Sequence, residues 1–304
     1  MTQWAAFTGL TLVVLCLLLV LTHLTQDALT DPAVSSSPSD HGETQAIPAG
    51  EGIDDEGAHS SDGEASHVAG GQHESPIADE DAAQIRPEQP QPPARGDPAS
   101  MSTGMLFANV AVSQGLFAGV LLGAIVITGI PAEALGITIS VEYLLTGLFL
   151  GTVFGVALYV ANELAAAGAT RFGFDHDEGL REMLAPETSS GWAVLLFVVL
   201  PIIAVFEELL FRAALIGVLS AGFAIDPWLL AIFSSVAFAL GHGIQGTVGI
   251  IVTGGLGFVL AAIFILTGSF LVVVVAHYFI NALEFVIHEG FGIEWAAWLE
   301  TEAA

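Results

Sequence analysis

The hydrophobic residues of this chain fall in long continuous runs rather than on one face of a repeating pattern. The first run covers about 4–22, and six more follow at about 105–130, 143–165, 192–216, 228–241, 247–267 and 270–289. An α-helix needs about 20 apolar residues to cross the hydrocarbon core of a bilayer. The pattern therefore predicts an all-α, polytopic transmembrane helical bundle, with about six core helices and one N-terminal anchor helix.

A polar stretch separates the first run from the others. Residues 26–104 are rich in Asp, Glu, Gly, Ser, Pro and Ala, and contain 16 acidic residues against Arg86 and Arg95. Such a segment cannot bury enough apolar surface to offset the entropy lost on folding. We therefore expect three parts: an N-terminal transmembrane anchor at 1–25, a disordered acidic linker at 26–104, and a membrane core at 105–304.

The charge balance limits the classes of molecule that the protein can bind. The 304 residues include 32 acidic and 5 basic side chains, for a formal net charge of −27, and no lysine is present. This balance excludes nucleic acid, whose phosphates require a basic surface. The missing lysine and the acidic excess resemble the composition of proteins from salt-in halophiles, in which salt screens the repulsion between carboxylates.

Ionisable residues interrupt the apolar runs at a few positions. In the run at 192–216, Glu207, Glu208 and Arg212 follow one another closely. A charged side chain at the centre of a membrane helix costs about 2.5–3.5 kcal/mol, so its presence suggests chemistry or transport. Glu208 and Arg212 stand four residues apart and share a helix face, as an ion pair requires. Glu207 points about 100° away from that face, so we expect it to be the carboxylate available as a general base.

Two later runs add polar residues with the same spacing. Phe238 and His242 end the run at 228–241, and His277 and Asn281 lie four apart in the last run. Glu284 and His288 continue the polar stripe of that last run. Three polar elements on three helices favour a polar cavity between helices.

Simpler interpretations exist for each element. A Glu–Arg pair can fix helix register, and Asn in a membrane helix often hydrogen-bonds a neighbouring helix. Intramembrane Glu, His and Asn also form proton relays, so a polytopic transporter is an alternative function. A non-catalytic membrane scaffold with the same buried polar cluster is a second alternative.

The three elements, in this order, resemble a known family. Glu-Glu-x-x-x-Arg at 207–212, Phe-x-x-x-His at 238–242 and His-x-x-x-Asn at 277–281 are similar to the three motifs of the CPBP intramembrane proteases. That family includes CAAX prenyl endopeptidases and bacterial proteins linked to bacteriocin self-immunity. The resemblance covers roughly 105–289, and every motif position is filled.

The resemblance implies an enzyme that hydrolyses a peptide bond in a membrane-associated peptide or protein. By position, Glu207 would activate the attacking water with the help of His242, and His277 and Asn281 would stabilise the oxyanion. Three further residues would support the site: Glu208, Arg212 and Phe238. The implied location is the cell membrane, which the chain crosses several times, and the oligomeric state stays open.

The participation of a metal also stays open. A catalytic zinc ion usually has three protein ligands, and Glu207, His242 and His277 could supply them. No His-Glu-x-x-His motif is present, however, so the sequence favours a mechanism without zinc over one that uses it.

Overall fold

The computed structural model of the protein describes residues 2–30, 102–171, 179–242 and 246–293, and these segments contain helices and no strand. The α-helices are α1 (Trp4–Thr30), α2 (Thr103–Thr128), α3 (Val141–Arg171), α4 (Gly179–Leu184), α5 (Ser189–Val194), α6 (Leu200–Glu208), α7 (Leu219–Phe223), α8 (Pro227–Gly241), α9 (Gly246–Thr267) and α10 (Phe270–Glu284). A 3₁₀-helix, η3 (Ala132–Leu135), and three π-helical segments, η4 (Leu195–Val199), η5 (Leu209–Val218) and η7 (Phe285–Gly290), complete the described elements. The predicted all-α class is confirmed.

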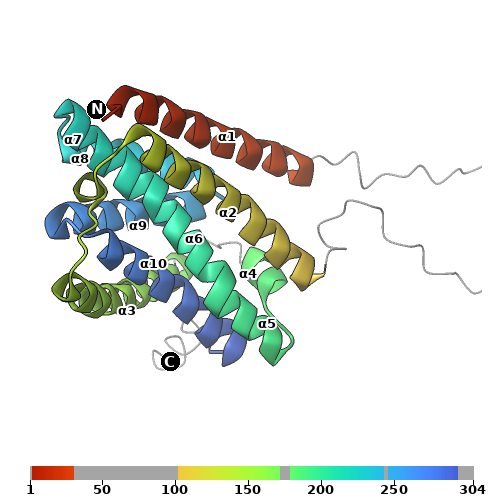
Figure 1. Cartoon of the computed structure of the whole chain (residues 1–304). Helices are drawn as coiled ribbons and strands as arrows, with labels where there is room; N and C mark the ends of the chain where they lie inside the picture. Colours follow the sequence, from red (N-terminus) through yellow and green to blue (C-terminus); the bar gives the residue numbers. More distant parts are fainter. Residues whose placement is uncertain (1, 31–101, 172–178, 243–245, 294–304) are drawn as a thin grey trace, which may run out of the picture. The chain divides into compact units, whose positions relative to one another are not determined.

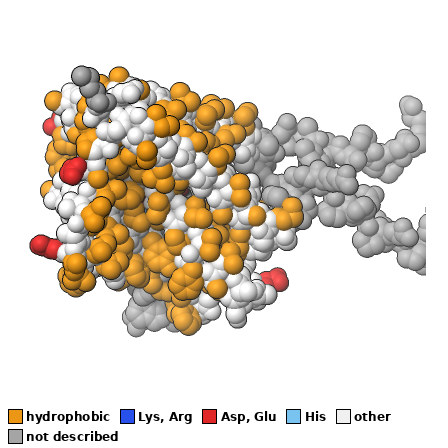
Figure 2. Space-filling model, viewed as in Figure 1, with side chains coloured by type: hydrophobic (Ala, Val, Ile, Leu, Met, Phe, Trp, Pro, Cys, Tyr) orange, Lys and Arg blue, Asp and Glu red, His pale blue; other side chains and the backbone are white. Residues whose placement is uncertain are grey.

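Six of the helical segments in the described residues are long and apolar enough to cross a membrane, and the first of them lies near the N-terminus. α8 is apolar but shorter than these six. Many large hydrophobic side chains, such as Val126, Ile127 and Phe197, are exposed. Figure 2 shows hydrophobic side chains over most of the visible face, with acidic groups at its margins. A surface of this kind suits lipid rather than water.

The helix boundaries follow recognisable local signals. Asp226 caps the N-terminus of α8 by accepting hydrogen bonds from the backbone N–H groups of Trp228 and Leu229 at 2.9 and 3.1 Å. Gly129 ends α2 with a left-handed conformation, φ 65°, which costs glycine little. α3 differs from the expected span at 143–165 because it continues to Arg171, through a stretch rich in alanine that contains Gly168 but no proline.

A long, bent span lies at the centre of the bundle. It runs from Ser189 to Phe223 and is built from α5, η4, α6, η5 and α7. Its middle part is enclosed by other helices: every residue of η5 except Gly217 is buried. Figure 1 shows α6 between α2 and α10, and both of these helices contact it. Side chains on α6 and η5 therefore face protein rather than lipid.

α3 and α10 pack against each other through glycines. A Cβ atom at Gly151 would lie 2.5 Å from the Cβ of Val275, and one at Gly155 would lie 2.6 Å from the Cβ of Phe279. A Cβ atom at Gly147 would lie 2.6 Å from Cδ2 of Leu271. The absence of side chains at these three positions lets the two backbones approach, as in other membrane helix pairs.

Candidate active site

The buried Glu208 joins two helices of the bundle. Its Oε1 accepts a hydrogen bond from Arg212 Nη1 at 2.8 Å and another from His277 Nδ1 at 2.7 Å. The predicted Glu208–Arg212 pair is thus present, and its two side chains are at most 1% exposed. Because a carboxylate only accepts, Nδ1 of His277 carries a hydrogen atom. The Nε2 atom of His277 is left to face the opposite direction.

Glu207 lies on the side of His277 that Nε2 faces. The distance between Glu207 Oε2 and His277 Nε2 is 3.7 Å, which is too long for a direct hydrogen bond. Oε2 is inaccessible to solvent and has no hydrogen-bond partner among the described residues. A buried carboxylate oxygen without a partner is costly in a structure that only has to be stable. Its position beside a histidine suits a group that binds a reactant.

Phe238 connects the remaining polar side chains. Its ring centroid lies 4.5 Å from that of His242 and 6.3 Å from that of His277. The guanidinium carbon of Arg212 lies 4.7 Å from the same ring centroid, in a cation–π arrangement. Phe238 thus contacts Arg212, His242 and His277.

His242 lies at the C-terminal end of α8 and is half-buried. Its Nδ1 lies 2.8 Å from the backbone carbonyl oxygen of Phe238. Since a carbonyl oxygen only accepts, Nδ1 donates and Nε2 carries the lone pair. No hydrogen bond joins His242 to Glu207 in the described part of the chain, so only the ring of Phe238 links His242 to the other motifs.

Asn281 follows His277 by one turn of α10 and is half-buried. Its side-chain amide makes no hydrogen bond with another described residue, so its donor groups are available. Glu208 contacts His277, and Arg212 contacts Gly257. The ion pair therefore orients the histidine rather than the glutamate.

The structure adds two positions that the sequence did not indicate. Arg212 Nη2 donates to the carbonyl oxygen of Gly257 on α9 at 3.0 Å. A Cβ atom at Gly257 would lie only 3.0 Å from the Phe238 ring, so glycine permits this close approach. Ser234 donates to the carbonyl oxygen of Phe211 at 2.6 Å and satisfies a backbone group in η5. A glycine in an apolar helix gives no sequence signal for such a role.

The three residues considered as zinc ligands do not form a compact ligand set. In the described residues, the group of His, Cys, Asp or Glu side chains whose ligand atoms all lie within 4.8 Å of one another is a different one: Glu163, Glu284 and His288. Glu207, His242 and His277 are not gathered in this way. The arrangement around Glu207 does not fit a zinc ion.

The fold and the site define a multi-pass membrane protein with a buried group of polar side chains, in which one carboxylate oxygen of Glu207 has no hydrogen-bond partner among the described residues. Residues 189–283 match the family model of the Rce1-like type II CAAX prenyl endopeptidases. The match contains all three motifs, confirms the resemblance seen in the sequence, and indicates a protease. No curated protein matches the chain, and no solved structure does.

Proposed function

We propose that the protein is an intramembrane endopeptidase in which Glu207 acts as the general base. The observation that supports this most directly is the buried Glu207 Oε2, which lacks a hydrogen-bond partner in the described residues and lies 3.7 Å from His277 Nε2. A water molecule bound there would be next to a proton acceptor, as peptide hydrolysis requires.

The reaction proceeds in two steps. Glu207 takes a proton from water while the water oxygen bonds to the peptide carbonyl carbon, and His242 Nε2 accepts a hydrogen bond from the same water. The oxyanion that forms receives hydrogen bonds from His277 Nε2–H and from the Asn281 amide. The C–N bond then breaks, and the leaving amine takes the proton from Glu207.

Glu208, Arg212 and Phe238 position these groups. Glu208 holds His277 at Nδ1 and Arg212 holds Glu208, so the ring of His277 keeps one orientation. His277 is doubly protonated before the reaction and stays so throughout, with Nδ1–H held by Glu208 and Nε2–H donating to the oxyanion. Phe238 keeps the imidazole of His242 close to this centre.

The substrate of the proposed enzyme is a membrane-associated peptide or protein, and the bilayer surrounds both. The name of the matching family suggests a prenylated C-terminal peptide as the first substrate to test. We further propose that residues 1–25 anchor the chain, that 26–104 form a linker and that 105–304 form the protease core, in the cell membrane.

The proposal is tested by comparing the termini of membrane proteins in cells that express the wild type, Glu207→Gln or Glu142→Gln. Glu142 is exposed at the start of α3, so its replacement is a matched control for the loss of one carboxylate. Mass spectrometry should find new termini in the wild type and in Glu142→Gln. These termini should be absent from Glu207→Gln, since removing a general base lowers the rate by about 10²–10⁴-fold.

Two further measurements make the comparison decisive. The thermal midpoint of purified Glu207→Gln should equal that of the wild type, which excludes misfolding as the cause of lost cleavage. Equal sets of termini in all three strains, with equal protein levels, would contradict the protease assignment. Ion flux through liposomes that contain the wild type would then favour the transporter alternative.

A further inference from the structure

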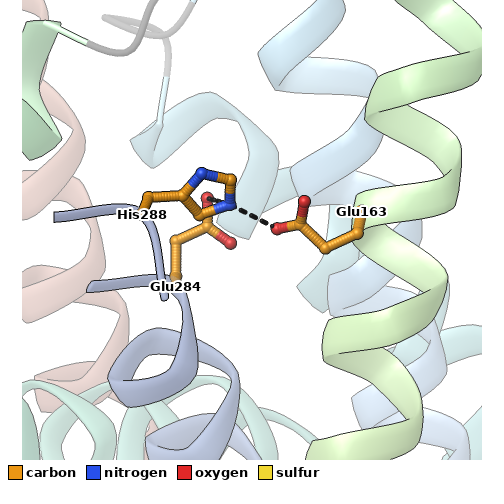
Figure 3. A group of neighbouring side chains, drawn as sticks. All are labelled: Glu163, Glu284 and His288. Carbon is orange, nitrogen blue, oxygen red and sulfur yellow. Dashed lines mark hydrogen bonds and ion pairs between the residues drawn. The ribbon is translucent and has the colours of Figure 1, made fainter. Parts of the chain in front are cut away.

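A second group of buried polar side chains lies outside the proposed catalytic centre. Glu163 on α3 faces Glu284 at the end of α10 and His288 in η7, as Figure 3 shows. Glu163 and His288 are 6% and 8% exposed. His288 Nε2 lies 2.8 Å from Glu163 Oε1 and 3.9 Å from Glu284 Oε1. Glu284 and His288 belong to the polar stripe seen in the sequence, but the proposed peptide hydrolysis uses neither.

The glycine contacts explain why two carboxylates meet here. Gly147, Gly151 and Gly155 are four residues apart, and the same spacing leads through the buried Tyr159 to Glu163. A Cβ added at Gly151 of α3 would approach the carbonyl oxygen of Val272 on α10, and a Cβ added at Gly155 would approach the carbonyl oxygen of Ala276. Continuing this register by steps of four places residue 284 opposite residue 163. Two glutamates therefore face each other beyond the glycine contacts, in the same helix register.

The charges of this group do not cancel. Arg181 on α4 donates to Glu284 Oε1 at 2.8 Å and to Glu289 Oε1 at 2.9 Å. Arg181 thus pairs with two of the three carboxylates, and the third, Glu163, faces His288. With His288 neutral, these described side chains carry a net charge of −2. Uncompensated charge among membrane helices is costly. A divalent cation would balance the two charges.

The donor atoms suit a divalent transition metal ion. The ligand atoms of Glu163, Glu284 and His288 all lie within 4.8 Å of one another. Around a tetrahedral zinc ion with bonds of about 2.0–2.2 Å, neighbouring ligand atoms are about 3.3 Å apart. His288 Nε2 lies 2.8 Å from Glu163 Oε1 and 3.9 Å from Glu284 Oε1, the oxygen to which Arg181 also donates, and these two separations bracket that value.

One carboxylate oxygen of this group has no hydrogen-bond partner among the described residues. Glu284 Oε2 is inaccessible to solvent and has no hydrogen-bond partner among the described residues, whereas Arg181 holds the other oxygen of the same carboxylate. Metal-binding carboxylates are commonly held by hydrogen bonds from residues outside the ligand set. Buried acceptor atoms without partners are rare in folded proteins.

We propose that Glu163, Glu284 and His288 bind a divalent transition metal ion that clamps α3 to the C-terminal end of α10. His288 contributes Nε2, and the two glutamates contribute one oxygen each. Three protein ligands leave a fourth position for water. The site is separate from Glu207, because Glu284 follows His277 by seven residues, or about 10 Å along a helix.

The test is the metal content of the full chain, purified in detergent, loaded with Zn²⁺ or Mn²⁺ alone and dialysed. Mass spectrometry of the metal should find about one ion per chain in the wild type, as for a site with one set of protein ligands. Glu163→Gln and His288→Gln should each weaken binding more than about tenfold, since removing even an outer partner costs 10–100-fold. Glu142→Gln, on the same helix as Glu163, should bind as the wild type does.

Two results would overturn the inference. The first is a wild-type protein that binds neither ion, and this result does not depend on the folding of any variant. The second is a metal ion that Glu163→Gln retains and Glu207→Gln loses, because that ion would belong to the proposed catalytic centre. Metal content is measured without a substrate, so a failure of the protease proposal leaves this test unaffected.

Discussion

Arg212 is the largest fully buried side chain in the described residues, and three different contacts hold it. Glu208 supplies a carboxylate, Gly257 a carbonyl oxygen and Phe238 a ring face. The chain has only five basic residues, so the use of one here indicates a specific role. Among individual residues, the site is therefore a series of contacts: Arg212 holds the carboxylate of Glu208, and Glu208 holds the ring of His277.

The order of these contacts leads to a prediction about stability. We expect Glu208→Gln to lower the free energy of unfolding by about 3–5 kcal/mol, because it leaves Arg212 buried without a counter-charge. The double variant Glu208→Gln with Arg212→Met should recover part of this loss, since it removes the unpaired charge. Chemical unfolding in detergent measures both values. A double variant less stable than Glu208→Gln alone would contradict the prediction.

At the scale of elements, the contact between α3 and α10 decides where His277 and Glu284 lie. The glycines of α3 contact the side of α10 that carries Leu271, Val275 and Phe279. α10 carries polar residues of both the proposed catalytic centre and the proposed metal site. A change in the distance between these two helices should therefore affect both sites.

A substitution in this contact should show the effect. Gly151→Ala would place a Cβ 2.9 Å from the carbonyl oxygen of Val272, a backbone atom that cannot rotate away. We expect it to lower the free energy of unfolding by about 1–3 kcal/mol, as overpacked cores do. The proteolytic activity should fall as well, because α10 carries His277 and Asn281.

The matched control is Gly255→Ala on α9, where no atom lies within 4 Å of the added Cβ. Alanine is a better helix former than glycine, so this variant should be unchanged or more stable by about 0.5–1 kcal/mol. Equal stability for Gly151→Ala and Gly255→Ala would show that the helix contact is not tight. Thermal unfolding in the same detergent compares the two variants directly.

At the scale of the whole molecule, the acidic excess is the dominant property. The formal net charge is −27. Repulsion between like charges destabilises the compact folded state relative to the unfolded chain. We expect the thermal midpoint to rise as potassium chloride increases from about 0.1 M to about 1 M, over which the screening length falls from about 10 Å to about 3 Å. Glycerol at matched osmolality is the uncharged control. A midpoint that stays constant or falls with salt would contradict a stabilising role for screening.

The sequence predicted the membrane spans and the local pair, but not the contacts between distant segments. Runs of apolar residues indicate spans because hydrocarbon thickness sets their length, and a spacing of four predicts the Glu208–Arg212 bond. The bond between Glu208 and His277 joins residues 69 apart, and that between Glu163 and His288 joins residues 125 apart. Helical periodicity specifies which face a residue occupies, but not which helix faces it. The importance of Glu163, Arg181 and Gly257 therefore emerged only from the structure.

The position of each ion pair along the chain also has a consequence for biogenesis. Glu208 and Arg212 belong to one span, so their charges already compensate each other when that span leaves the translocon and enters lipid. Arg181 and Glu284 lie on separate elements 103 residues apart, and their bond can form only after α10 has arrived. The contacts between helices are thus complete only after the last span has been inserted. A ribosome that stalls before α10 would leave a nascent chain that lacks His277 and also lacks Glu284 and His288, the partners of Glu163.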